Sequence, residues 1–182
     1  DPLTGIIYMT EDINDSLIYR YIPNQKANLQ SGGRLQALVI TPQPKFDTRN
    51  WHSGSMPLNQ EMAVEWIELD HTESPNDDLR LRGFNAGAAL FARGEGIHWG
   101  DNELYFCCTN GGAKKLGQIM RYVPSLVEGS PSENKRPGKL SLFVESEYPQ
   151  TMNFADNVTV APSGHLIVCE DQYTDYTENH IK

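Results

Sequence analysis

The stretch Ile7–Asp12, IYMTED, decides the fold, because two later stretches align with it without gaps. They are Leu104–Thr109, LYFCCT, which begins 97 residues later, and Leu166–Asp171, LIVCED, which begins a further 62 residues along the chain. An internal repeat at such large spacings is typical of a repeated β-unit. The first and third copies carry Glu11 and Glu170 at the same position, and a symmetric fold can gather such acidic residues in one place.

The sequence beside these stretches extends the repeat to a unit of four strands. Arg20–Pro23, RYIP, is echoed by Arg121–Pro124, RYVP, and a third strand is expected over Gly33–Ile40 and again over Gly138–Glu145. Turn residues between short alternating runs are typical of antiparallel hairpins. One complete unit spans Arg93–Glu145. Tandem four-stranded units predict an all-β fold, a partial β-propeller.

The chain holds about two and a half such blades, expected to form one domain over residues 1–182. The predicted blade pieces are residues 4–70, 91–147 and 153–182, and residues 70–92 form an insertion with a short helix or packed loop at Gly83–Leu90. Glu128–Pro137 is expected to be an exposed polar loop. Because a closed propeller has roughly 4–8 blades, we expect an internal piece of a longer protein.

Composition narrows the function classes. The formal net charge is −9 and the sequence pI is about 4.9, which disfavours nucleic-acid binding. No apolar run approaches the ~20 residues of a membrane span. The cysteines show no zinc-binding spacing and are expected to be small core residues: Cys107, Cys108 and Cys169. The oligomeric state is open, with a monomer as the expectation.

Blade geometry suggests where the chemistry lies. The first strand of a blade lines the central channel and the second runs back beside it, so the start of one and the end of the other share a face. Glu11 and Glu170 end second strands, whereas Glu95 begins a first strand with Arg93 on the same side. The 62-residue offset assigns Asn157 to the position of Glu95. We therefore expect these groups to converge on one mouth of the channel.

Converging carboxylates raise each other's pKa or recruit a cation. Oxygen ligands from Glu, Asp and Asn suit Ca²⁺ at about 2.3–2.6 Å, and carboxylates also suit Fe³⁺. Arg93 beside such a cluster is suited to clamp a phosphate, because a guanidinium binds phosphate oxygens bidentately. Salt bridges that cap the blade ends are the structural alternative. Whether Asp156, Asn157 or Cys108 joins the site is left open.

Several motifs carry a resemblance to the PhoX-type alkaline phosphatases, a family of bacterial metal-dependent phosphatases. In chain order they are Tyr8–Asp12 (YMTED), Gly32–Leu38 (GGRLQAL), Phe91–Ile97 (FARGEGI), Gly117–Ile119 (GQI), Asp156–Pro162 (DNVTVAP) and Cys169–Asp171 (CED). The resemblance implies a six-bladed propeller exported by the twin-arginine route to the periplasm or beyond. It also implies ferric and calcium ions and the hydrolysis of phosphate monoesters, with diesters left open.

Carried over residue by residue, the resemblance makes Glu11, Glu95 and Glu170 metal ligands and Arg93 the residue that holds the substrate phosphate. Two other functions stay open. One is a calcium-dependent lactonase of the gluconolactonase type, because Asp156–Asp171 also resembles a strand pair of that propeller. The other is a non-enzymatic propeller in which calcium is a structural pin.

Overall fold

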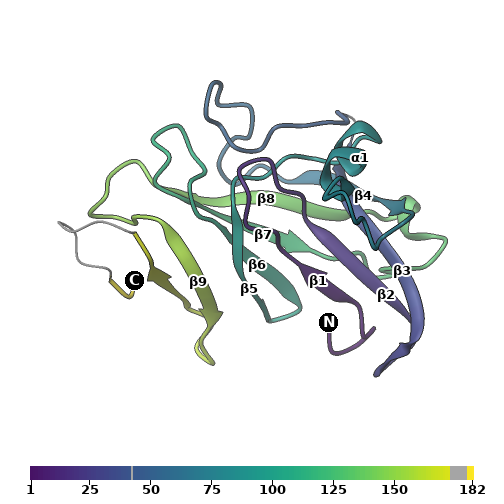
Figure 1. Ribbon diagram of the computed structural model, residues 1–182. Helices are drawn as coiled ribbons and strands as arrows, with labels where there is room; N and C mark the ends of the chain where they lie inside the picture. The colour runs from purple at the N-terminus through teal and green to yellow at the C-terminus, as the bar shows by residue number, and fades with distance from the viewer. Residues whose placement is uncertain (42, 173–179) are drawn as a thin grey trace.

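The computed structural model describes residues 1–41, 43–172 and 180–182, and it consists mainly of antiparallel strands (Figure 1). The predicted third blade piece, residues 153–182, is therefore described apart from residues 173–179. In chain order the elements are β1 (Ile7–Met9), β2 (Tyr19–Gln25), β3 (Asn28–Ile40), β4 (Met62–Leu69), α1 (Leu79–Asn85), β5 (Gly94–Gly100), β6 (Glu103–Cys108), β7 (Gln118–Val123), the 3-10 helix η1 (Glu133–Lys135), β8 (Gly138–Glu145), β9 (Ala155–Val160) and β10 (Leu166–Glu170).

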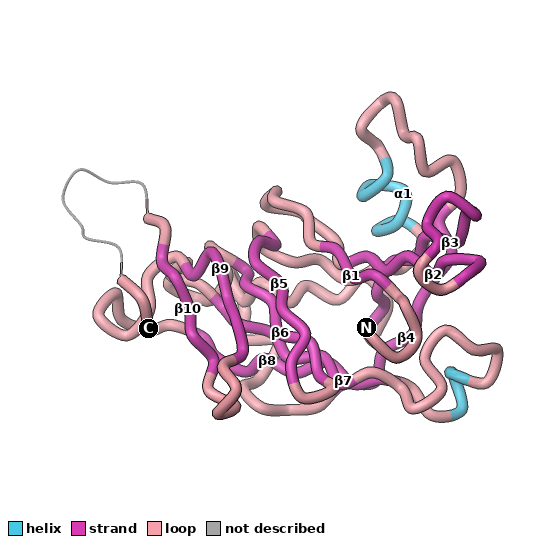
Figure 2. Tube along the Cα trace, turned by 90° about the horizontal axis from the view of Figure 1, so that it is seen from below, coloured by secondary structure: helices cyan, strands magenta, loops and turns pink. Residues whose placement is uncertain are grey.

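The strands form three successive units, as the repeat predicts. Figure 2 shows β9 and β10 at one side, β5–β8 in the middle and β1–β4 at the other side. The repeated strands pair alike: Tyr8 of β1 lies opposite Arg20 of β2, and Tyr105 of β6 lies opposite Arg121 of β7. The prediction of an all-β, partial propeller is confirmed, with β1, β6 and β10 as the second strands of their units.

The units are not separate sheets. Strand β4 pairs with β3 on one side and with β8 on the other, where Met62 lies opposite Leu140, so the order is β1-β2-β3-β4-β8-β7-β6-β5. The repeat has no counterpart of β4, and the sequence therefore gave no reason to expect this link. An unpaired outer edge exposes a row of backbone hydrogen-bonding groups, and β4 covers that edge of both β3 and β8.

Apolar side chains fill the spaces between the units. The main core lies between the first and second units and includes Tyr8, Leu38, Phe106, Met120 and Leu140. A second core lies between the second and third units and includes Ile119, Met152, Val158 and Val168. The strands of the second unit are therefore buried on both faces.

Burial on both faces of the second unit explains why two adjacent cysteines can both be buried. Successive residues of a strand point to opposite faces. Cys108 accordingly lies in the first core and Cys107 in the second, and both are fully buried. Cys169 of β10 is exposed, so the prediction of a core residue is wrong there, because this side chain points away from the second unit.

Two loop predictions are refined by the structure. Helix α1 ends at Asn85, so the helix lies earlier than the predicted Gly83–Leu90, whose end is packed instead, with Ala88 and Ala89 fully buried. The Glu128–Pro137 segment is exposed only in part, because Glu128 and Glu133 are buried against Arg20. Among the residues that the structure describes, no helix is long and apolar enough to cross a membrane.

Candidate active site

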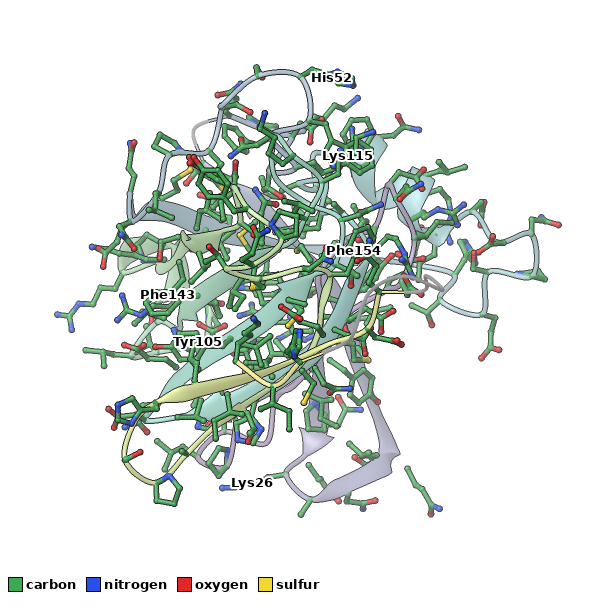
Figure 3. All side chains as sticks on the ribbon, turned by 90° about the vertical axis from the view of Figure 1, so that its left-hand side faces the viewer. Lys26, His52, Tyr105, Lys115, Phe143 and Phe154 are labelled. Carbon is green, nitrogen blue, oxygen red and sulfur yellow. The ribbon has the colours of Figure 1, made fainter. Side chains whose placement is uncertain are left out.

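A pocket of about 290 Å³ lies where the second and third units meet. It is formed by the starts of the first strands β5 and β9 and the ends of the second strands β6 and β10, as the blade argument expects. In Figure 3 the labelled Phe154 lies near the middle of the view, between Lys115 and His52 above it and Lys26 at the bottom. The pocket is lined by Arg93, Glu95, Thr109, Phe154, Asp156, Asp171 and Gln172.

A β-bulge in β5 places Glu95 in the pocket. Gly94 lies opposite Cys108 and Ile97 lies opposite Phe106, so two residues of β5 between these pairs face a single residue of β6. Such an extra residue bends the strand and re-aims a side chain. Glu95 is the first residue of the bulge and lines the pocket.

The third unit repeats the bulge in β9. Ala155 lies opposite Glu170 and Val158 lies opposite Val168, so again two residues of one strand face a single residue of the other. Asp156 therefore has the position of Glu95, and both carboxylates line one pocket.

The assignment of Asn157 to the position of Glu95 is thus wrong by one residue. The offset of 62 holds for the second strands, but the turn between β9 and β10 is one residue longer than the turn between β5 and β6. The first strands are consequently related by 61 residues. Asn157 takes the place of Gly96, and Asp156 becomes the second carboxylate.

The backbone around the pocket follows the same symmetry. Arg93 and Phe154 precede the bulges and have positive φ angles of 51° and 55°. The N–H of Thr109 donates to the carbonyl of Arg93, and the N–H of Asp171 donates to that of Phe154, both at 3.0 Å. Each unit therefore holds its first strand against the residue that follows its second strand.

Charge is unevenly distributed over the pocket. Arg93 donates from Nε and Nη2 to the carboxylate of Asp12, at 2.7 and 3.0 Å, and its Nη2 lies 3.7 Å from Oε1 of Glu95. The hydrogen bond from Arg93 lowers the pKa of Asp12. Burial, the hydrogen bond and charge of Asp12 and the charge of Asp156 raise the pKa of Glu95 to about 7. Burial and the charges of Asp171 and Asp12 also raise the pKa of Asp156. The single positive charge of the Arg93 guanidinium does not neutralise the negative charge of these carboxylates.

Of the predicted site residues, the structure brings Arg93 and Glu95 together in this pocket. Glu11 accepts a hydrogen bond from the hydroxyl of Tyr19 at 2.8 Å and does not line the pocket. Glu170 is buried and accepts from the backbone N–H of Asn153 at 2.9 Å, again outside the pocket lining.

Cys108, which the sequence left open, lies in the core, and burial raises the pKa of its thiol to about 12. The sequence analysis missed Asp12, Thr109 and Asp171 as site residues. They share one signal: each is the last residue of the aligned stretches, one position after Glu11, Cys108 and Glu170.

Gly96 sets the distance between the two bulged strands. A Cβ there would lie 2.6 Å from the Cα of Asn157 and from the carbonyl oxygen of Asp156. Because these are backbone atoms, Gly96→Ala must push β9 away from β5, and we expect a loss of about 1–3 kcal/mol in the free energy of unfolding. Urea unfolding measures this loss. Gly54→Ala is the matched control, since its Cβ would meet nothing within 4 Å. Equal stability of the two variants would contradict the close approach.

Comparison with known proteins places the chain in a family. The model of the family described as Alkaline phosphatase PhoX matches residues 1–181. The chain belongs to the PhoX family. This assignment covers every residue of the pocket. None of the curated proteins compared with the chain matches it.

A solved structure supports the PhoX fold. The chain is similar to Pseudomonas fluorescens PhoX in complex with vanadate, a transition state analogue, with a TM-score of 0.62 and 18% sequence identity. The match covers 97% of this chain and 39% of that chain, so the present chain spans about two fifths of the length of this relative.

Proposed function

We propose that this chain contributes to the metal-dependent hydrolysis of phosphate monoesters. The observation that carries the proposal is a single guanidinium, Arg93, at a pocket lined by Glu95, Asp156 and Asp171, in a chain whose family is described as alkaline phosphatase. A phosphoryl group needs a cationic clamp and neutralisation of the charge that develops in the transition state. The solved relative is in complex with vanadate, a transition state analogue, which supports the same class of reaction.

Arg93 is the proposed phosphate clamp. Asp12 holds two of its nitrogens and so fixes the plane of the guanidinium at the pocket wall. A guanidinium fixed in this way binds phosphate oxygens with less loss of side-chain entropy than a free one. Phe154 forms an apolar part of the wall, which keeps water away from one side of the bound group.

The pocket acids are the proposed metal-binding groups, and their chemistry fits hard cations. Carboxylate oxygens are the ligands of Ca²⁺ and are also accepted by Fe³⁺. The raised pKa values of Glu95 and Asp156 indicate negative charge that a cation would neutralise. No three acidic, His or Cys side chains among the described residues already form a metal-binding group, so the acids would have to draw together on binding.

We propose Glu95, Asp156 and Asp171 as the residues that hold calcium and ferric ions here. Glu11 and Glu170 stay predicted ligands, each with a present hydrogen-bond partner that it would have to exchange. Bound metal ions would polarise the phosphoryl oxygens and offset developing negative charge. The part of this chain is to position those ions beside Arg93, to orient the phosphate and to exclude water.

Removal of metal is the direct test. In the full-length protein, a chelator should reduce p-nitrophenyl phosphate turnover by about 100-fold or more. The reason is that the metal ions, acting as Lewis acids, contribute several kcal/mol to catalysis. Adding back Ca²⁺ and Fe³⁺, separately and together, should identify which ion restores the rate. Turnover that is indifferent to chelation would exclude this mechanism.

Substrate, partner and location follow from the same proposal. A small phosphate ester is the proposed partner, and export to the periplasm or the medium is the proposed location, as in the phosphatases that the motifs resemble. Fractionation of cells that produce the full-length protein tests the location, with a cytoplasmic marker enzyme as the control.

A further inference from the structure

Thr109 presents a buried hydroxyl without a hydrogen-bond partner at the pocket. The residue ends the β6 repeat stretch, is 1% exposed and lines the pocket together with Arg93. Its Oγ1 has no hydrogen-bond partner within the part of the chain that the structure describes. Buried hydroxyls in folded proteins are almost always hydrogen-bonded, so an exception at a pocket calls for an explanation.

Among the residues that the structure describes, the other buried threonine side chain is satisfied in the usual way. Thr48 is fully buried, and its Oγ1 donates to the carbonyl of Leu90 at 2.7 Å. Thr10, which also lies beside the site, donates from its Oγ1 to the carbonyl of Glu95 at 2.6 Å. Thr109 differs from both, because its Oγ1 has no such acceptor within the described part of the chain.

The backbone fixes Thr109 relative to the clamp. Its N–H donates to the carbonyl of Arg93 at 3.0 Å, so the two residues form one wall of the pocket. A group that bonds to Arg93 from within the pocket therefore lies in the same pocket that Thr109 lines. A hydroxyl can donate to the oxygen of an anion, which a carboxylate at the same position would repel.

The repeat shows that Thr109 differs in charge from the residues at the equivalent positions of the other units. The equivalent positions carry Asp12 in the first unit and Asp171 in the third. Thr109 is the neutral member of the set, and it faces the same pocket as Arg93 and Asp171. This position therefore offers a hydrogen-bond donor beside the cationic clamp, whereas an acidic residue there would weaken anion binding.

We infer that Thr109 is a substrate-contacting residue whose hydroxyl donates a hydrogen bond to a phosphoryl oxygen held by Arg93. This inference rests on the proposed phosphatase function and deepens it, since it names a second group that binds the phosphate. It also explains the unpartnered Oγ1, because the substrate oxygen completes its hydrogen bonding.

The test uses Thr109→Val, which keeps the shape but removes the hydroxyl, and Thr109→Ser, which keeps the hydroxyl. We expect Thr109→Val to lower kcat/KM for p-nitrophenyl phosphate by about 10- to 100-fold, the effect of losing a hydrogen bond to a charged group. The affinity for inorganic phosphate, measured by calorimetry, should fall in parallel. Thr109→Ser should restore most of both values.

Stability separates this role from a structural one. Thr109→Val should unfold at the same urea concentration as the parent or a higher one, because no internal hydrogen bond is lost. Thr48→Val is the matched control and should unfold at a lower concentration, because it loses the bond to Leu90. A destabilised Thr109→Val protein would reveal an internal partner and overturn the inference.

Failure of the inference about Thr109 can be distinguished from failure of the proposed function. If the parent hydrolyses phosphate esters and Thr109→Val does so equally well, with unchanged affinity for phosphate, the inference fails while the proposed function stands. If the parent hydrolyses no phosphate ester, the proposed function fails. Calorimetry with inorganic phosphate then still decides about Thr109, because equal affinities of the parent and Thr109→Val would overturn its role as a phosphate contact.

Discussion

Arg93→Ala should reduce kcat/KM for phosphate monoesters by about 100- to 1,000-fold, the usual effect of removing one charge-stabilising group from an active site. Arg93 is the cationic side chain in the pocket lining, and its guanidinium is held in place by Asp12. Without it, the acids would repel the phosphate unless metal ions alone offset their charge. Steady-state kinetics with p-nitrophenyl phosphate measures the loss.

The backbone of Arg93 calls for a second variant. Its φ of 51° is unfavourable for most side chains but not for glycine. Arg93→Gly should therefore lose as much activity as Arg93→Ala while folding without added strain. Arg93→Lys keeps the charge but not the bidentate fork, and it should recover only part of the rate. A stable Arg93→Gly protein with parental activity would exclude Arg93 as the phosphate clamp.

The same variants separate the proposed phosphatase from the lactonase that the sequence left open. A lactonase needs a carboxylate base and calcium but no phosphate clamp, so Arg93→Gly should largely spare lactone hydrolysis. Stability should change by only about 0–1 kcal/mol, because the ion pair with Asp12 is partly exposed. Calcium binding without hydrolysis of either substrate would instead favour the non-enzymatic propeller.

The sequence predicted the fold well because the repeated stretches align with one another without gaps. Alignment of the second strands showed which residues end these strands. The observed pairing of Tyr8 with Arg20 and of Tyr105 with Arg121 agrees with this alignment. Strand β4 lies outside the repeat, and nothing in a repeat shows which edges an additional strand will cover.

The candidate site was predicted only in part. Arg93 and Glu95 were found because they begin a first strand, but Asp156 was displaced by one residue. A turn of different length shifts the register of everything before it, and a single sequence does not show in which turn the extra residue lies. The directions of the Glu11 and Glu170 side chains depend on hydrogen bonds from Tyr19 and Asn153, which an alignment of the repeated strands does not show.

Burial of charge was the least predictable feature. Arg20 and Arg121 have equivalent positions in the repeat, yet the side chain of Arg20 is 2% exposed and that of Arg121 is 29% exposed. The difference comes from the segment that follows β7, which folds over Arg20 and delivers Glu128 and Glu133 to it. No local pattern distinguishes the two arginines, because their neighbours come from distant parts of the chain.

This contrast gives the largest expected effect on stability. Arg20 donates to Glu128 at 2.6 Å and to Glu133 at 2.6 and 2.7 Å, and its Nε donates to Gln36 at 2.7 Å. Arg20→Met would leave two buried carboxylates without their cation. We expect a loss of about 3–5 kcal/mol in the free energy of unfolding, as for other buried ion pairs that lose one partner. Urea unfolding measures this loss.

The repeat supplies the control for this experiment. Arg121→Met removes the equivalent arginine, whose partner Glu103 is reached by solvent, and it should cost no more than about 1 kcal/mol. Glu128→Gln together with Glu133→Gln in the Arg20→Met protein should recover part of the loss, because neutral amides replace the unpaired charges. Equal losses for Arg20→Met and Arg121→Met would mean that the buried network adds nothing beyond a surface ion pair. Stability would then depend on the packing of Tyr8, Trp66 and Tyr122 around it.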